Sequence, residues 1–186
     1  NFVRPDPESE YSHLEERNLW LIRLQHNMNL NDHLNLNLGG SYWYSDIDNK
    51  TMSEHGSTQR WAAFSKLSYE ALVVTATVGH TQTDNKDPLS PDISIMGSFD
   101  SIYPIANDGY FYTVDLSYHL KLNEKSSFTP YLTYSHFDKD KTSFIDSTRY
   151  TIGAQWDLHP ISVAAEYIYG KSDHFIGGTQ QGFAAG

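Results

Sequence analysis

The segment from Leu19 to Ser45 alternates apolar and polar residues with a period of two. The apolar positions of its first half are Trp20, Ile22, Leu24, His26, Met28 and Leu30, and the positions between them include Arg23, Gln25, Asn27 and Asn29. After Asn31-Asp32 the alternation restarts, with Leu34, Leu36, Leu38, Gly40, Tyr42 and Tyr44 on one side. Successive side chains of a strand point to opposite faces, so this pattern predicts two antiparallel strands joined by a tight turn.

Six further segments alternate in the same way: 59–69, 72–82, 110–122, 126–137, 148–158 and 161–171. The chain is therefore predicted to be all-β, with eight strands in four hairpins forming one antiparallel up-and-down domain over residues 1–186. The strands occupy 18–171, between loops at 1–17 and 172–186. Polar connections at 46–58, 83–109 and 138–147 alternate with turns of two or three residues. The sequence thus predicts short turns at one end of the sheet and long loops at the other.

Composition excludes several classes of protein. No apolar run approaches the ~20 residues of a membrane helix. Cysteine is absent, so there is no disulfide or thiol chemistry. A formal net charge of -10 argues against nucleic-acid binding, because no basic patch is available to neutralise phosphates. The opening NFVRPDPESE carries no charged-then-apolar leader, so a secreted precursor would already have lost one.

The apolar face of the eight predicted strands contains no Asp, Glu, Lys or Arg. Its aromatic residues lie mostly near strand ends, and aliphatic residues fill the middles. Each strand has about the ~9 to 11 residues that a tilted strand needs to cross a bilayer. Aromatic residues on both sides of an apolar band are typical of transmembrane β-barrels. The excess negative charge lies in the long loops, and we expect it to face outside, where divalent cations would bridge it to lipopolysaccharide.

The pattern resembles a bacterial outer-membrane porin. The resemblance covers residues 18–171 and rests on the alternating strands, the aromatic girdles and turns such as LNDHL, LNEKSS and LHPI between acidic loops. It implies a transmembrane β-barrel in a Gram-negative outer membrane, in contact with lipid, without a cofactor and without enzymatic activity. Complete barrels of this class normally place both termini at the short-turn end, so we expect an internal or C-terminal portion of a larger barrel. A closed eight-stranded barrel remains open as an alternative.

If the apolar face meets lipid, the polar face lines a lumen. The expected pore-lining residues are Arg23, Gln25, Asn27, Asn35, Asn37, Arg60, Lys66, Asp115, His119, Lys121, Arg149, Asp157 and Glu166. They suit a water-filled channel for passive diffusion of small hydrophilic solutes, including ion transport. The alternative is a structural, adhesion or receptor barrel whose polar residues pair and plug the interior. More bases than acids line the wall, but the loops are acidic, so the ion preference stays undecided.

Three other features carry weaker expectations. Inward aromatics at Trp43, Phe64, Phe111 and Tyr131 either stack on sugar rings or brace the wall, and bracing is favoured. The connection 83–109 is long and has two apolar pieces, so we expect it to pack into the mouth and narrow it. The nine histidines show no metal-ligand spacing, and no catalytic motif is present. His26 lies mid-strand on the lipid side, where a neighbouring subunit, as in a homotrimer, would cover it.

Overall fold

The computed structural model describes residues 14–50, 52–89, 91–98, 101–140 and 144–172. All regular elements in these ranges are strands. Their bounds are β1 Leu14–Asn29, β2 Leu34–Asn49, β3 Glu54–Tyr69, β4 Leu72–Asp84, β5 Ile93–Ser98, β6 Ser101–Ala106, β7 Asp108–Tyr118, β8 Leu120–Asn123, β9 Ser126–Lys139, β10 Ser147–Leu158 and β11 Ile161–Lys171.

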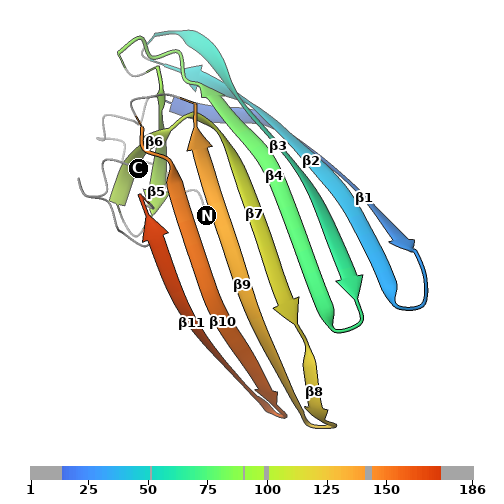
Figure 1. The fold of residues 1–186 in the computed structure, drawn as a ribbon. Helices are drawn as coiled ribbons and strands as arrows, with labels where there is room; N and C mark the ends of the chain where they lie inside the picture. Colours follow the sequence, from blue (N-terminus) through green and yellow to red (C-terminus); the bar gives the residue numbers. More distant parts are fainter. Residues whose placement is uncertain (1–13, 51, 90, 99–100, 141–143, 173–186) are drawn as a thin grey trace.

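The main sheet is antiparallel and follows the chain order, β1-β2-β3-β4-β7-β9-β10-β11, with the short β8 paired to β9. The predicted all-β up-and-down architecture is therefore confirmed. The sheet is curved, and its short connections gather at the lower end in Figure 1. Among the described residues β1 pairs only with β2 and β11 only with β10, so backbone pairing does not close the sheet. The arrangement is compatible with a β-barrel and leaves one open edge on each side.

The strands extend further toward the long-connection end than the alternation predicts. Residues 46–58 are predicted as a loop, but β2 continues to Asn49 and β3 begins at Glu54, which leaves only 50–53 as a connection. Residues 138–147 are likewise shortened to 140–146, and β1 begins within the predicted loop 1–17. The strict alternation of very short and very long connections is therefore wrong. The rest of loops 1–17 and 172–186, apart from Ser172, lies outside the described residues.

The predicted connection 83–109 contains a second, two-stranded sheet. Its two apolar pieces form β5 and β6, which pair from Ile93 with Ala106 to Ser98 with Ser101. The side chains between Ser94 and Pro104 are outside the described part of the chain, so narrowing of the mouth by this hairpin stays a prediction. The predicted strand 110–122 is interrupted at His119, whose backbone N–H donates to the carbonyl oxygen of Ala71 at 2.8 Å.

The two faces of the main sheet differ in exposure. Along β7, every second side chain from Tyr110 to Tyr118 is exposed, and those between are half-buried. We call the first the outer face and the second the inner face, because side chains on the concave side of a curved sheet crowd together. Nearly all the exposed large apolar side chains of the strands lie on the outer face. Among the described residues only Ile47 and Ala106 are buried apolar side chains, so this sheet covers no apolar core.

Candidate functional site

Cross-strand register places all the predicted pore-lining residues on the inner face, since residues directly opposite each other in an antiparallel pair share a face. One row across the sheet shows this: Asn27 lies opposite Asn37, Asn37 opposite Lys66, Lys66 opposite Thr75, and Thr75 opposite Asp115. His119 lies between β7 and β8. The other predicted residues occupy equivalent inner positions on their strands: Arg23, Gln25, Asn35, Arg60, Lys121, Arg149, Asp157 and Glu166. Their role as a pore lining is not tested by this placement.

The three acids among the predicted pore-lining residues are held by donors of the wall itself. Thr133 Oγ1 donates to Asp115 Oδ1 at 2.7 Å, and the Tyr131 hydroxyl donates to Glu166. Asp157 accepts from Ser127 Oγ at 3.2 Å, Gln155 Nε2 at 2.8 Å and Ser162 Oγ at 2.6 Å. Carboxylates bonded in this way are fixed in position close to the backbone.

Two arginines of the inner face, Arg23 and Arg60, lie against aromatic rings. The guanidinium of Arg60 lies 5.1 Å from the centroid of the Trp43 ring, and that of Arg23 lies 6.0 Å from the centroid of Phe64. Both distances fall within the range of cation–π contacts. Such contacts orient a guanidinium without cancelling its charge.

Three of the inner aromatics pack against glycines of the neighbouring strands, and the choice between bracing and sugar stacking stays a prediction. Phe64 lies over Gly39 of β2, Phe111 over Gly79 of β4 and Tyr131 over Gly153 of β10, so that a Cβ at any of these glycines would overlap the ring. Each ring thus fills the space that its cross-strand partner leaves free. At these three positions glycine leaves room for the ring of the neighbouring strand.

Two hollows open at the short-turn end of the inner face. One, of about 510 Å³, is lined by His119, Lys121 and Asp157 with the turns 124–125 and 159–160. The other, of about 590 Å³, is lined by Asn29, Asn35 and Ser68 with the turn at Asn31–Leu34. The structure therefore brings three of the predicted residues around one hollow and separates them from Arg60 and Arg149, which lie nearer the opposite end.

A belt of aromatic rings crosses the outer face from β3 to β11. Trp61 and Tyr110 meet edge to face at 6.5 Å between centroids, with His80 4.3 Å from Tyr110. The belt continues from β9 to β11, where Tyr134 lies 5.1 Å from Tyr150, and Tyr150 lies 6.4 Å from Tyr169. The cross-strand register shows that the rings of the belt lie nearer the short turns on β9 to β11 than on β3 to β7. A belt at constant height on tilted strands shifts in this way.

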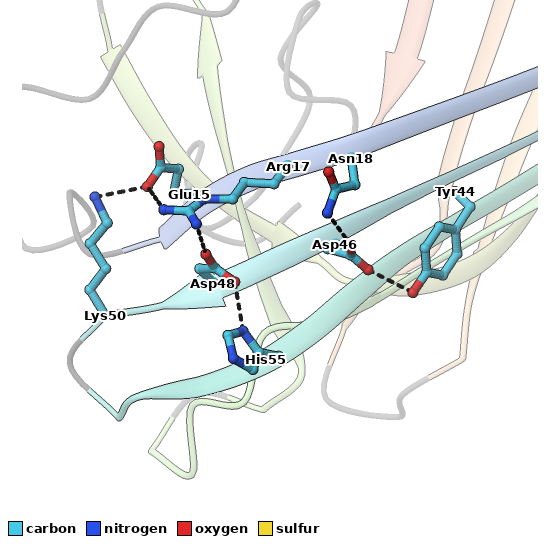
Figure 2. A network of polar contacts seen from close by, with 8 residues as sticks. All are labelled: Glu15, Arg17, Asn18, Tyr44, Asp46, Asp48, Lys50 and His55. Atoms are coloured by element: carbon cyan, nitrogen blue, oxygen red, sulfur yellow. Dashed lines mark hydrogen bonds and ion pairs between the residues drawn. The ribbon is translucent and has the colours of Figure 1, made fainter.

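Beyond the belt, the outer face of β1 to β3 becomes charged (Figure 2). Arg17 forms ion pairs of 2.9 Å with both Glu15 and Asp48, and Lys50 reaches Glu15 at 2.9 Å. The hydrogen bond from Lys50, followed by that from Arg17, lowers the pKa of Glu15 to about 2. This charged extension marks where the apolar band ends on these strands.

Buried asparagines hold the base of the β5–β6 hairpin, and sequence reasoning missed them. Asn107 Nδ2 donates to the carbonyl oxygen of Thr83 at 2.7 Å and to that of Pro91. Asn85 Nδ2 donates to the carbonyl oxygen of Ile93 at 2.7 Å, and Asn49 Nδ2 to that of Asn85 at 3.2 Å. Their only sequence sign is asparagine within polar segments, which also suits an open loop.

Comparison with known proteins gives no relative: no protein-family model matches the chain, and no curated protein or solved structure matches it significantly. The described residues contain no helix long and apolar enough to cross a membrane. In the same part of the chain, no three His, Asp or Glu side chains come together as a metal site would require.

Proposed function

We propose that this chain forms the wall of an outer-membrane porin, a water-filled channel for passive diffusion of small hydrophilic solutes through a transmembrane β-barrel. The observation that carries the proposal is the uncovered apolar face. Exposed large apolar side chains occur on the outer face of every strand of the main sheet except β4, as in Ile22, Leu67, Leu116 and Ile152, and β4 adds the exposed Ala76. Contiguous apolar surface of this extent is rare on soluble monomers and indicates a contact surface.

The borders of that face favour lipid as the contact. The aromatic belt lies between the apolar band and the charged extension, as aromatic side chains do at membrane–water interfaces. Trp156 occupies the opposite border, where its indole N–H donates to Ser126 Oγ at 3.0 Å. The polar inner face then lines an aqueous interior. Contacts with lipopolysaccharide and assembly as a homotrimer belong to the same proposal, and neither needs a cofactor or an enzymatic step.

Planar-bilayer recording of the purified chain, refolded in detergent, tests the function. A channel gives discrete current steps whose size is proportional to voltage. Inner-face side chains that meet across a narrow barrel and plug it would give a correctly inserted but silent protein. Insertion is scored separately by protease protection of the strands in the same vesicles. Silence of an inserted protein contradicts the porin and favours a structural or adhesion barrel.

A further inference from the structure

The two sides of the inner face differ in charge: β7 to β11 carry acids together with the bases Lys121 and Arg149, whereas the middle of β1 to β4 carries bases alone. Between the level of Trp43 and the short turns, the inner face of β1 to β4 carries Arg23, Arg60 and Lys66 and no acid. The inner acids of the same band lie on β7 to β11. Glu16 and Glu54 lie beyond Trp43, toward the long connections. We call Arg23, Arg60 and Lys66 the basic track.

The basic track runs along both sides of β2, with Arg23 on β1 and Arg60 and Lys66 on β3. Arg60 lies opposite Trp43 of β2, Arg23 opposite Ser41, and Lys66 opposite Asn37. From Trp43 to Asn37 the strand rises by about 20 Å at ~3.4 Å per residue. Three positive charges are therefore spread along about 20 Å of the wall, between the level of Trp43 and the short turns.

The charges of the track are not neutralised by protein groups. None of its three residues forms an ion pair within 4.0 Å with any residue that the structure describes. All three side chains are exposed, whereas Asp115 and Asp157 are half-buried. Long cationic side chains thus extend from the wall, and those two acids are short and held by wall donors.

The nearest of these acids, Asp115, lies two strands from Lys66, so three positive charges stand near one hydrogen-bonded acid and the track keeps a positive potential. Charges separated by more than the Debye length, ~10 Å at 0.1 M salt, are largely screened from one another. Because of this screening, the negative charge of the long connections changes the potential at the mouth and not in the middle of the wall. A single-sign lining raises the local concentration of the opposite ion.

We propose that the basic track attracts small anions and makes the channel prefer anions to cations. The preference rests on the proposed porin function, but the attraction itself does not require a through-path. The substrate class is small hydrated anions, such as chloride or short carboxylates.

Trp43 provides a readout of the track that does not depend on conductance. Its ring lies beneath the Arg60 guanidinium, whereas Trp20, Trp61 and Trp156, the other tryptophans of the chain, lie on the outer face. In a chain with these three changed to Phe, fluorescence quenching of Trp43 by aqueous iodide is compared with quenching by caesium. A potential of about +1 kT would favour iodide by a factor of ~7.

The expected result is stronger quenching by iodide than by caesium, lost when Arg23, Arg60 and Lys66 are changed to Gln. Changing Arg17, a base on the outer face of β1, to Gln is the matched control and leaves the ratio unchanged. Equal quenching by both ions, absence of quenching, or a preference that survives the triple substitution overturns the proposal. In channels that conduct, the reversal potential in a potassium chloride gradient shifts toward chloride equilibrium, and a shift toward potassium also overturns it.

The two failures are distinguishable. Iodide preference at Trp43 in a silent protein contradicts the porin and keeps the anion site. Conducting channels that select cations contradict the anion site and keep the porin.

Discussion

Replacing Leu116 with Arg separates a lipid-facing outer face from a water-facing one. Leu116 lies on the outer face of β7, between Val74 and Leu132, and its side chain is 40% exposed. It lies four residues below Tyr112 on the strand, which is about 13 Å at ~3.3 Å per residue. For a strand tilted by ~40° this is about 10 Å of depth below the aromatic belt.

At that depth a lipid-facing Arg costs ~2–4 kcal/mol of unfolding free energy, because the guanidinium must leave water or distort the bilayer. An exposed position in water gives a different result. There a surface substitution usually changes stability by no more than ~0.5 kcal/mol. The two surroundings of Leu116 therefore predict outcomes that differ by more than the usual error of a denaturant titration.

The assay is guanidinium unfolding of the protein in phosphatidylcholine vesicles, followed by tryptophan fluorescence. Gln155→Arg is the matched control, because Gln155 is an exposed inner-face residue whose amide already contacts Asp157. We expect Leu116→Arg to lose ~2–4 kcal/mol and Gln155→Arg to stay within ~0.5 kcal/mol of the parent. Equal effects of the two substitutions would refute the reasoning.

Three other predictions follow from local contacts. The pKa of Glu15 is lowered to about 2, so its ion pairs stabilise the fold above about pH 4.5 and are lost as pH falls toward 2, which NMR titration of its carboxyl measures. Asn107→Ala removes two hydrogen bonds to backbone carbonyls at the hairpin base, and we expect faster limited proteolysis of residues 85–92. Gly79→Ala places a methyl group in the Phe111 ring, and we expect lower unfolding free energy, partly restored by Phe111→Leu.

Each of these has a contrasting control. Titration of Glu15 near 4.5 would show that Lys50 and Arg17 do not hold it in solution. Asn123→Ala, at the exposed end of β8, should leave proteolysis of 85–92 unchanged, and an equal effect would contradict the role of Asn107. Gly40→Ala meets only the Ala62 carbonyl oxygen at 3.3 Å, so an equal loss at Gly40 and Gly79 would contradict the ring-packing explanation.

The sequence predicts the fold wherever the two faces of a strand have different surroundings. Alternation from Trp20 to Leu30 and from Tyr110 to Tyr118 assigns each residue to a face, and the register agrees. The pattern stops where both faces are polar, although backbone pairing continues. For that reason the ends of β1, β2 and β3, stabilised by ion pairs such as Arg17 with Asp48, are predicted as loops.

The inner face was predictable in membership but not in its contacts. Which residues share the face follows from their parity along each strand. Which of them meet depends on register between strands, and no residue pattern states that Arg60 covers Trp43 or that Phe64 covers Gly39. The β5–β6 hairpin was missed because its apolar pieces are short, and a short apolar run alone does not distinguish a strand from a packed loop.

The surroundings of the outer face are measured most directly by spin labels along β9. The chain has no cysteine, so one cysteine can be introduced at a time from Ser127 to Phe137. In lipid vesicles, the account predicts that labels at outer positions such as Leu132 and Tyr134 collide with oxygen dissolved in lipid. Labels at inner positions such as Thr133 and Ser135 should collide with an aqueous nickel complex. Uniform access of the nickel complex to both sets would contradict it.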